Sequence, residues 1–433
     1  MSRLVDQRSP WATRIAPKDI INMTITDVNN PFNRFTLLLS NRDIIIQWLQ
    51  KVGLLAVDVR CEKCNVDCKL SVRDRAIDGY TWRCPARHET TIRRFSFFAK
   101  SHLHIPDIIN FVITYAEGQS LWKCAQAAGV GYGSTTVDWD NFCRDLFVEY
   151  YVRQIWDEQF HGEVEVDESL FGRRTKYHKG DPRGMKVWIF GIVERTTNRL
   201  KVYPVETRDA DTLMGVIKDN VATGSTIYTD GWSAYSGLQA AGFNHYVIEH
   251  KKAFSRECRD QATGQLITVH TNRIEGCWKH AKDYFRRMNG TKISQFEGHL
   301  CELMWRWWDR RPKPEAILCL IKEYYTLDAP PQFTAANPVF STWSRHPTDS
   351  PDDSMSRWDT DDDERDAGDD VQNTATATQS STSTELTTTT ATTSTSTCTQ
   401  QSSEPQVTTT TTTAPQPKKT NRLALIKNLR KVN

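Results

Sequence analysis

Three acidic residues in the second half of the chain stand where secondary structure could bring them together. Asp167 lies in the alternating segment EVEVDESLFG, Asp230 ends the segment STIYTD, and Glu275 lies near the start of a helix expected from about Asn272. Three carboxylates at one point bind two divalent cations, which activate an attacking water or 3′-hydroxyl and stabilise the leaving oxygen at phosphorus. Oxygen ligands and this chemistry favour Mg²⁺, with Mn²⁺ as a substitute. Each acid alone has an ordinary explanation, such as a surface strand residue or the start of a turn.

A second group of potential metal ligands lies earlier in the chain. Cys61 and Cys64 form a C-x2-C pair, and 19 residues later Cys84 and His88 form a C-x3-H pair. A C-x2-C turn holds two thiolates about one tetrahedral edge apart, and a second pair brought alongside by a hairpin completes a closed structural zinc site. Cys68 is an alternative fourth ligand, and the alternative to a metal site is a set of unrelated buried cysteines.

The segments around the acids predict the elements that would position them. Strands are expected at 163–172, 186–194, 199–206, 225–230 and 245–250, with a helix at 210–221, a short helix at 231–242 and a long helix from 272. This β-β-β-α-β-α-β-α order is that of the ribonuclease-H-like fold. In that architecture the first and fourth strands are neighbours and the late helix crosses them, so the three acids can converge. We therefore expect an α/β domain with a mixed five-stranded sheet.

Helical patterns dominate the region between the cysteines and the first of these strands. Residues 105–158 show apolar spacing near 3.6, interrupted by GVGYG at 129–133. The helices 121–129 and 134–144 form a candidate helix-turn-helix, whose second helix would offer polar side chains to a DNA groove: Ser134, Thr135, Thr136, Asp138 and Asn141. A plain two-helix hairpin within a bundle has the same pattern. A further helix is expected at 41–52.

Composition separates an ordered, basic part from an acidic tail. Residues 1–345 carry 47 Lys and Arg against 40 Asp and Glu, whereas residues 346–433 carry 8 against 13. A basic ordered part favours an anionic partner such as nucleic acid. The tail is rich in Asp and then in Thr and Ser, which predicts disorder. No signal peptide or membrane span is expected, and the 11 cysteines are expected to be free thiols or metal ligands.

Four sequence blocks resemble those of the ISXO-type transposases, bacterial insertion-sequence enzymes related to the eukaryotic Merlin transposons. The blocks are VDESLFG, YTDGWSAY, HTNRIEGCWKHAK and GHLCELMWR, and the similarity covers about residues 160–312. The resemblance implies that Asp167 and Asp230 are the first two metal ligands and that Glu275 is the third acid. Asn272 matches an Asn described in the third role in some relatives, so both residues stay candidates. Lys282 matches a Lys that would contact phosphate, although an exposed helix lysine is an equal alternative.

These observations predict five regions. They are an N-terminal helical region at 1–55, a zinc ribbon at 56–100, a helix-turn-helix-like region at 101–158, a ribonuclease-H-like catalytic domain at 159–328 and a disordered tail at 346–433. The predicted function is DNA transposition by metal-dependent phosphodiester hydrolysis and strand transfer. The expected partners are double-stranded DNA, as transposon terminal repeats and target, and a second copy of the chain. The alternative is a domesticated DNA-binding regulator with an idle nuclease.

Three further expectations concern the segment before the last helices, a group of tryptophans and the cellular location. The segment 251–270, which is basic at its start, is expected to be a loop near the DNA or a plain connector. Trp305, Trp307 and Trp308 are expected to pack the last helix on the core. The Thr-rich tail suggests a eukaryotic host, and in a eukaryote the protein is expected in the nucleus. In a host without a nucleus it is expected in the cytoplasm.

Overall fold

The computed structural model describes residues 17–172, 186–249, 255–259, 264–288, 290–333 and 354–356. All of them fall in one compact unit, Met1–Asp359, and the second unit, Thr360–Asn433, lies outside the described residues. The predicted tail at 346–433 is therefore undescribed except for a three-residue strand. In the described part of the chain, no helix is both long enough and apolar enough to cross a membrane.

The N-terminal region is built from short helices. These are α1 Pro17–Ile20, the 3₁₀ helix η2 Thr26–Asn29, α2 Pro31–Leu38 and α3 Arg42–Val52. The Asn41 side chain caps α3 by accepting a hydrogen bond from the Ile44 N–H at 3.0 Å, and the helix ends at Gly53, which has a φ of 81°. The helix expected at 41–52 is thus confirmed. The sequence analysis missed the other three because they are too short to show helical periodicity.

A small antiparallel sheet follows, with strand order β1-β2-β3. Its strands are β1 Lys69–Val72, β2 Tyr80–Arg83 and β3 Glu89–Thr91. A buried ion pair fixes the turn between β1 and β2 to the segment after β3. Arg93 donates to both carboxylate oxygens of Asp78 at 2.6 Å, and it also donates to the carbonyls of Ser101 and Leu103. Arg93 thereby joins this sheet to the start of the next helix.

We expect Asp78→Ala to destabilise the chain by about 3–5 kcal/mol, because it leaves the Arg93 charge buried without its partner. The two side chains are only 2% and 7% exposed. The matched control is Asp67→Ala, because the Arg60–Asp67 pair is 67% and 87% exposed. That change should cost less than about 1 kcal/mol. Urea denaturation measures both values, and equal losses would contradict the expectation.

Three helices connect the small sheet to the large one: α4 Ile105–Ala116, α5 Leu121–Ala127 and α6 Ser134–Tyr150, the last continued by a π-helical turn, η3 Tyr151–Ile155. The helical reading of 105–158 is confirmed. Ser120 caps α5, and Gly129, with a φ of 63°, allows the chain to turn towards α6.

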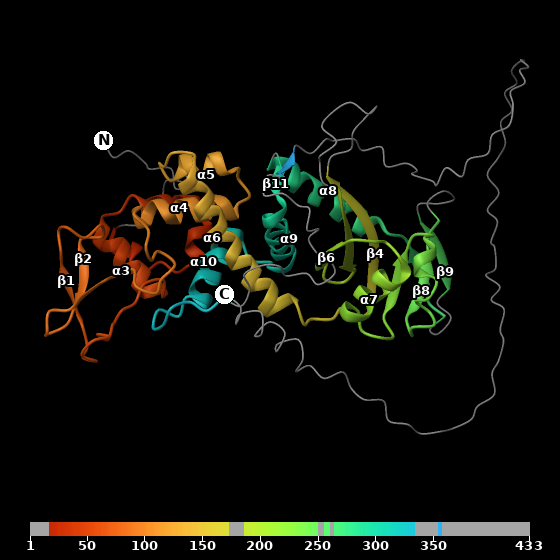
Figure 1. The fold of residues 1–433 in the computed structure, drawn as a ribbon, viewed down its shortest axis with the longest axis horizontal. Coiled ribbons are helices and arrows are strands. Elements are labelled where there is room, and N and C mark those ends of the chain that lie inside the picture. The colour runs from red at the N-terminus through yellow and green to blue at the C-terminus, as the bar shows by residue number, and fades with distance from the viewer. Residues whose placement is uncertain are drawn as a thin grey trace, which may run out of the picture. The chain divides into compact units, whose positions relative to one another are not determined.

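The large sheet has five strands in the order β6-β5-β4-β7-β8. Its strands are β4 Glu163–Gly172, β5 Lys186–Glu194, β6 Leu200–Val205, β7 Thr226–Thr229 and β8 Asn244–Val247. The pairs β4–β5 and β5–β6 are antiparallel, whereas β4–β7 and β7–β8 are parallel. The expected mixed five-stranded sheet is thus confirmed. Helix α7 Ala210–Asn220 connects β6 to β7, and α8 Asn272–Arg287 packs on β4 and β5 (Figure 1).

Two sequence expectations in this region were wrong. The short helix expected at 231–242 is only a 3₁₀ turn, η5 Ser233–Tyr235, followed by further turns. Its three glycines, Gly231, Gly237 and Gly242, weaken a helix. The segment 251–270, where described, contains an antiparallel pair, β9 Arg256–Arg259 with β10 Leu266–Val269, and so is not a plain loop. The fifth strand ends at Val247, and His250 lies outside the described residues.

The last helices return to the N-terminal part of the chain. They are α9 Ile293–Trp308, preceded by β11 Gly290–Lys292, and α10 Lys313–Tyr324; β11 pairs with β12 Ser354–Ser356. The Trp305 ring stacks on Phe147 of α6 with centroids 4.4 Å apart, and Trp308 Nε1 donates to the Leu200 carbonyl of β6 at 2.8 Å. Trp305 and Trp308 are buried, as expected, whereas Trp307 is half-buried.

Candidate active site and metal centre

Asp167 lies in β4 of the large sheet, and Asp230 is the first residue after the neighbouring strand β7. The parallel register pairs Glu165 of β4 with Tyr228 of β7, so two residues further along Asp167 is level with Asp230. The charge of Asp230 acts on Asp167. Burial, then the negative charges of Glu168 and Asp230, raise the pKa of Asp167 well above its usual value. The sheet therefore brings together two of the three predicted acids, at the end of β7.

Helix α8 lies on the sheet face that carries Asp167. Trp278 of α8 donates from Nε1 to the Asp167 carboxylate at 2.9 Å. Its ring fits over Gly191 of β5, the residue paired with Asp167. A Cβ at Gly191 would lie 2.5 Å from a Trp278 ring carbon. Further along β4, the Phe171 ring packs against the rings of Trp278 and Phe285. The sequence analysis did not identify Trp278 as a residue that touches the acids.

Glu165 fixes the beginning of α8. Its fully buried carboxylate accepts hydrogen bonds from the backbone N–H groups of Arg273 and Ile274, at 2.9 and 3.1 Å, in the first turn of the helix. It also accepts from Arg195 Nε at 2.8 Å. A negative charge at a helix N-terminus is favourable because it satisfies unpaired N–H groups and the helix dipole. The alternation of β4 places Glu165 and Asp167 on one face, which is the only sequence signal that could have found this role.

We expect Glu165→Gln to destabilise the chain by about 3 kcal/mol, since it removes the buried counter-charge of the largely buried Arg195 guanidinium and leaves it only the half-exposed carboxylate of Glu163. Amide hydrogen exchange should also speed up in the first turn of α8. Glu163→Gln is the matched control, because that carboxylate lies 3.7 Å from the same arginine but is 47% exposed. If Glu165→Gln lowers the free energy of unfolding no more than Glu163→Gln does in a denaturation experiment, the anchoring role of Glu165 is refuted.

Glu275 and Asn272, the alternative third ligands, both lie exposed in the first turn of α8. Among the described residues, the one group of three or more His, Cys, Asp or Glu whose ligand atoms all lie within 4.8 Å of one another is in the cysteine cluster. The three carboxylates therefore do not form so tight a group. Like charges repel, so a cation bound between carboxylates favours their close approach.

Glu168, next to Asp167, is a fourth carboxylate that the sequence analysis left without a role. Adjacent strand residues face opposite sides of a sheet, so Glu168 faces away from α8. Tyr235 of η5 donates to it at 2.5 Å. Burial raises the pKa of Glu168 against the Tyr235 hydrogen bond, and the charge of Asp230 raises it further. Glu168 therefore belongs electrostatically to the same acidic centre.

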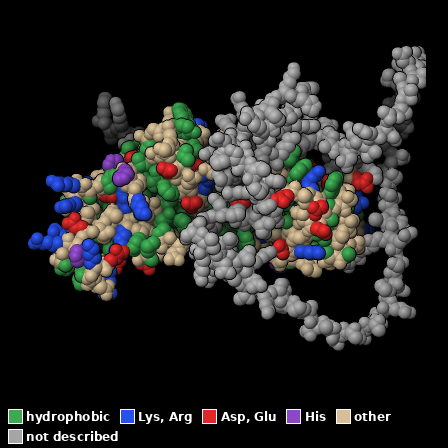
Figure 2. Space-filling view, in the orientation of Figure 1, with side chains coloured by type: hydrophobic (Ala, Val, Ile, Leu, Met, Phe, Trp, Pro, Cys, Tyr) green, Lys and Arg blue, Asp and Glu red, His purple; other side chains and the backbone are tan. Residues whose placement is uncertain are grey.

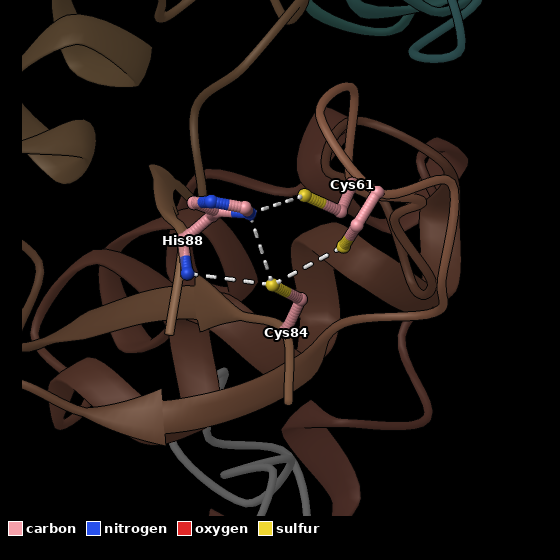
Figure 3. A group of neighbouring side chains, drawn as sticks. Cys61, Cys84 and His88 are labelled. Atoms are coloured by element: carbon pink, nitrogen blue, oxygen red, sulfur yellow. Dashed lines mark hydrogen bonds between the residues drawn. The ribbon is translucent and has the colours of Figure 1, made fainter. Parts of the chain in front are cut away.

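The predicted zinc ligands come together as a set. Cys61 Sγ and Cys84 Sγ each lie 3.5 Å from His88 Nδ1, and Cys64 Sγ lies 3.6 Å from Cys84 Sγ. Figure 3 shows Cys61, Cys84 and His88 pointing towards one another. With Zn–S distances of about 2.3 Å, a tetrahedral site has S–S edges of about 3.8 Å, so these separations fit zinc. The group could therefore hold zinc, and its fourth member is His88 rather than Cys68.

Two tight turns present these ligands. Asn65 follows the first pair with a φ of 53°, and Arg87 lies inside the second with a φ of 65°. The Asn65 N–H donates to the Cys61 carbonyl, and the Arg87 N–H donates to the Cys84 carbonyl. Hydrogen bonds from backbone N–H groups lower the pKa of Cys61 to about 6, which favours the thiolate that a metal binds.

Helices α5 and α6 have the order of the predicted helix-turn-helix, but fewer polar side chains are available than expected. Ser134, Thr135 and Asp138 are exposed at the start of α6. Thr136 is buried and donates to the Gly131 carbonyl at 3.2 Å. Asn141 is half-buried and accepts from Gln295 of α9 at 3.3 Å. Thr136 and Asn141 therefore stabilise the fold and are not free to contact DNA.

Comparison with known families identifies the domain that contains the acidic centre. Residues 159–307 match the family model of the ISXO2-like transposase domain. A protein of Haemophilus influenzae described as an uncharacterized transposase-like protein is 30% identical over 110 residues, which are 25% of this chain and 81% of that protein. The chain belongs to the ISXO2-like transposase family.

The match assigns the transposase domain to the large sheet and its helices. It runs from just before β4 almost to the end of α9, and so it includes Asp167, Asp230 and Glu275. The zinc-ligand group and helices α5 and α6 precede the matched residues. They are parts of a transposase chain that lie outside its family domain.

Proposed function

We propose that this transposase cuts and joins DNA by metal-dependent phosphoryl transfer in a ribonuclease-H-like domain, spanning 159–328. The observation that carries the proposal is the placement of Asp167 beside Asp230, with α8 fixed across the same strand by Glu165 and Trp278. A rigid sheet and a pinned helix hold ligands more accurately than loops do. The sheet order and strand directions agree with the ribonuclease-H-like arrangement expected from the sequence.

The geometry favours Glu275 over Asn272 as the third ligand. Trp278 marks the point on α8 that is level with Asp167, because it donates to that carboxylate. At a rise of about 1.5 Å per residue, Glu275 lies about 4.5 Å from Trp278 along the helix axis, and Asn272 about 9 Å. Lys282 lies about 6 Å beyond Trp278 on the other side, where it could meet a phosphate of the same strand. Asn272 then has a supporting role on the helix face.

Asp167, Asp230 and Glu275 would hold Mg²⁺ or Mn²⁺, which suit carboxylate ligands. The fit is supported by the negative charges of Glu168 and Asp230, which after burial raise the pKa of Asp167, because a divalent cation bound there would offset such charges. Bound there, the metal ions would make a water or a 3′-hydroxyl nucleophilic and neutralise charge on the phosphate.

The N-terminal modules, a helical region at 1–55, a zinc ribbon at 56–100 and a helix-turn-helix-like region at 101–158, are proposed to bind the terminal repeats as double-stranded DNA. Figure 2 shows Lys and Arg side chains projecting from the end of the molecule that carries β1 and β2. Exposed cations there include Lys63, Lys69, Arg73, Arg75, Arg83 and Arg87. Such side chains neutralise DNA phosphates.

A cavity of about 810 Å³ supports a common DNA path across the helices. Trp122 and Tyr132, around α5, line one part, and His280 and Arg287 of α8 line another. Aromatic and basic side chains are the groups that bind nucleic acid. Because α8 also carries Glu275, DNA held against α5 would extend towards the acidic centre.

The test is a cleavage and strand-transfer assay on labelled DNA that carries the element's ends, with Mg²⁺ or Mn²⁺ and a target plasmid. Wild type should release a 3′-hydroxyl end and join it to the plasmid, and Asp230→Ala should do neither. Two ends must be cut together, so the active complex should contain at least two copies, measurable by light scattering. Binding of the ends without cutting under either metal would favour a domesticated regulator with an idle nuclease.

We also infer a nuclear location from the Thr-rich tail at 346–433. A fluorescent fusion expressed in eukaryotic cells tests this, and a cytoplasmic signal would contradict it.

A further inference from the structure

Trp232 is an exposed aromatic side chain fixed beside one of the proposed catalytic carboxylates. It follows Asp230 by two residues, and its backbone N–H donates to Asp230 Oδ1 at 2.9 Å. The hydrogen bond closes a turn that holds the backbone of Trp232 beside the Asp230 carboxylate. Yet 40% of Trp232 is exposed, although burying a tryptophan is normally favourable. The proposed chemistry at Asp230 does not use this ring.

Arg208, in the connection between β6 and α7, adds a positive charge to the same place. Its guanidinium carbon lies 3.7 Å from the centroid of the Trp188 ring and 5.0 Å from that of Trp232. No carboxylate of the described residues lies within 4.0 Å of it as an ion-pair partner. Its charge reaches the acidic centre, because it lowers the pKa of Glu168 against the effect of burial. Arg208 is therefore a fixed cation held by rings rather than by an acid.

We propose that Trp232 and Arg208 form a nucleotide subsite of the acidic centre. The indole of Trp232 stacks on a base that has left the duplex next to the reacting phosphodiester, and Arg208 contacts a phosphate of the same strand. The subsite rests on the proposed function, because it places this base where Asp230 would act.

The chemistry of the two side chains fits one unpaired nucleotide. An indole face stacks on any base without reading its sequence, and a guanidinium donates in a plane to phosphate oxygens. Trp188 supports this role, because its half-buried ring fixes the guanidinium before DNA arrives. The turn that ties Trp232 to Asp230 restricts the stacked base to the neighbourhood of the cut.

The test of Trp232 combines a protein change with a DNA change. The probe is a duplex of the element's end in which an abasic site replaces each nucleotide near the cut in turn. Stacking on an aromatic ring contributes about 10- to 100-fold in binding. On intact DNA, Trp232→Ala should lose about this factor in single-turnover cleavage, and Trp232→Phe should lose much less. At one abasic position, Trp232→Ala should cause no further loss, because the ring has no base to hold.

Gln239→Ala is the control for loss of an exposed side chain in the same connection between β7 and β8, since Gln239 is exposed and neither the proposed site nor the proposed DNA-binding modules use it. It should cleave like wild type, and melting curves should show that all variants fold. Equal losses from Trp232→Ala on intact DNA and at every abasic position would overturn the subsite, and so would an unchanged rate on intact DNA.

The same comparison can be made without cleavage. With Ca²⁺ in place of Mg²⁺, dissociation constants for the same duplexes report the subsite even if wild type never cuts. Failure of the subsite and failure of the proposed chemistry are thus separate results. Arg208→Gln should weaken binding of intact DNA by about 10-fold but not that of DNA with an uncharged methylphosphonate at the contacted phosphate. An equal loss on both DNAs would remove Arg208 from the subsite.

Discussion

Asp167→Asn should abolish DNA cleavage while leaving the protein at least as stable as wild type. The amide keeps an oxygen that can accept from Trp278 Nε1, so the contact between β4 and α8 persists. The change removes a charge that burial and the neighbouring acids disfavour, as the raised pKa of Asp167 shows. Metal-assisted charge stabilisation contributes several kcal/mol, so the rate should fall by about 1000-fold or more.

The control for this variant is Asp211→Asn, which removes one exposed carboxylate from the first turn of α7. It should cleave like wild type. A catalytic role is supported if Asp167→Asn loses DNA cleavage and its melting temperature in metal-free buffer equals or exceeds that of wild type. A variant that loses activity because it melts several degrees lower would show that Asp167 serves the fold instead.

Removal of zinc should unfold the region around β1, β2 and β3. A closed structural zinc site contributes folding free energy directly, about 10–16 kcal/mol in small zinc-binding peptides. The core of this region is small and rests on few buried side chains, chiefly Trp82, Cys84, Ile92 and the Asp78–Arg93 pair. Hydrogen exchange should therefore show loss of protection in all three strands after chelation, while the large sheet stays protected.

Cys68 provides the matched control for the zinc site. It is close enough that the charges of Cys61 and Cys84, after burial, raise its pKa, yet it lies outside the four-ligand group. His88→Ala should lower the zinc content of purified protein to well below one equivalent, and Cys68→Ala should leave it unchanged. The reverse result would make Cys68 the fourth ligand.

Much of the large sheet was predictable because its strands are short apolar runs separated by clear turns. The expected strand at 186–194 coincides with β5, and the expected helix at 210–221 differs from α7 by one residue. The pairing of β4, which carries Asp167, with β7, which precedes Asp230, was also expected from the ribonuclease-H-like order of elements. The β9–β10 pair was not predictable, because its residues are mostly exposed and its sequence reads as a polar connector.

The residues that position the acids were harder to find in the sequence. Glu165 looks like any acid in an alternating strand, and its burial depends on Arg195 and on the first turn of α8. The contact between Trp278 and Gly191 can be recognised only once α8 is known to pack on the sheet. Arg208 and Trp232 are 24 residues apart in the chain and meet only through the fold. Tertiary contacts of this kind leave no local pattern.

Mn²⁺ binding, followed by the electron paramagnetic resonance signal of free Mn²⁺, tests the central claim most directly. The protein is first saturated with zinc, so that the cysteine cluster cannot take up manganese. Wild type and Asp211→Asn should bind Mn²⁺ and reduce the free signal, whereas Asp167→Asn and Asp230→Ala should leave it near that of buffer. Equal Mn²⁺ binding by all four proteins would contradict a metal site built on Asp167 and Asp230.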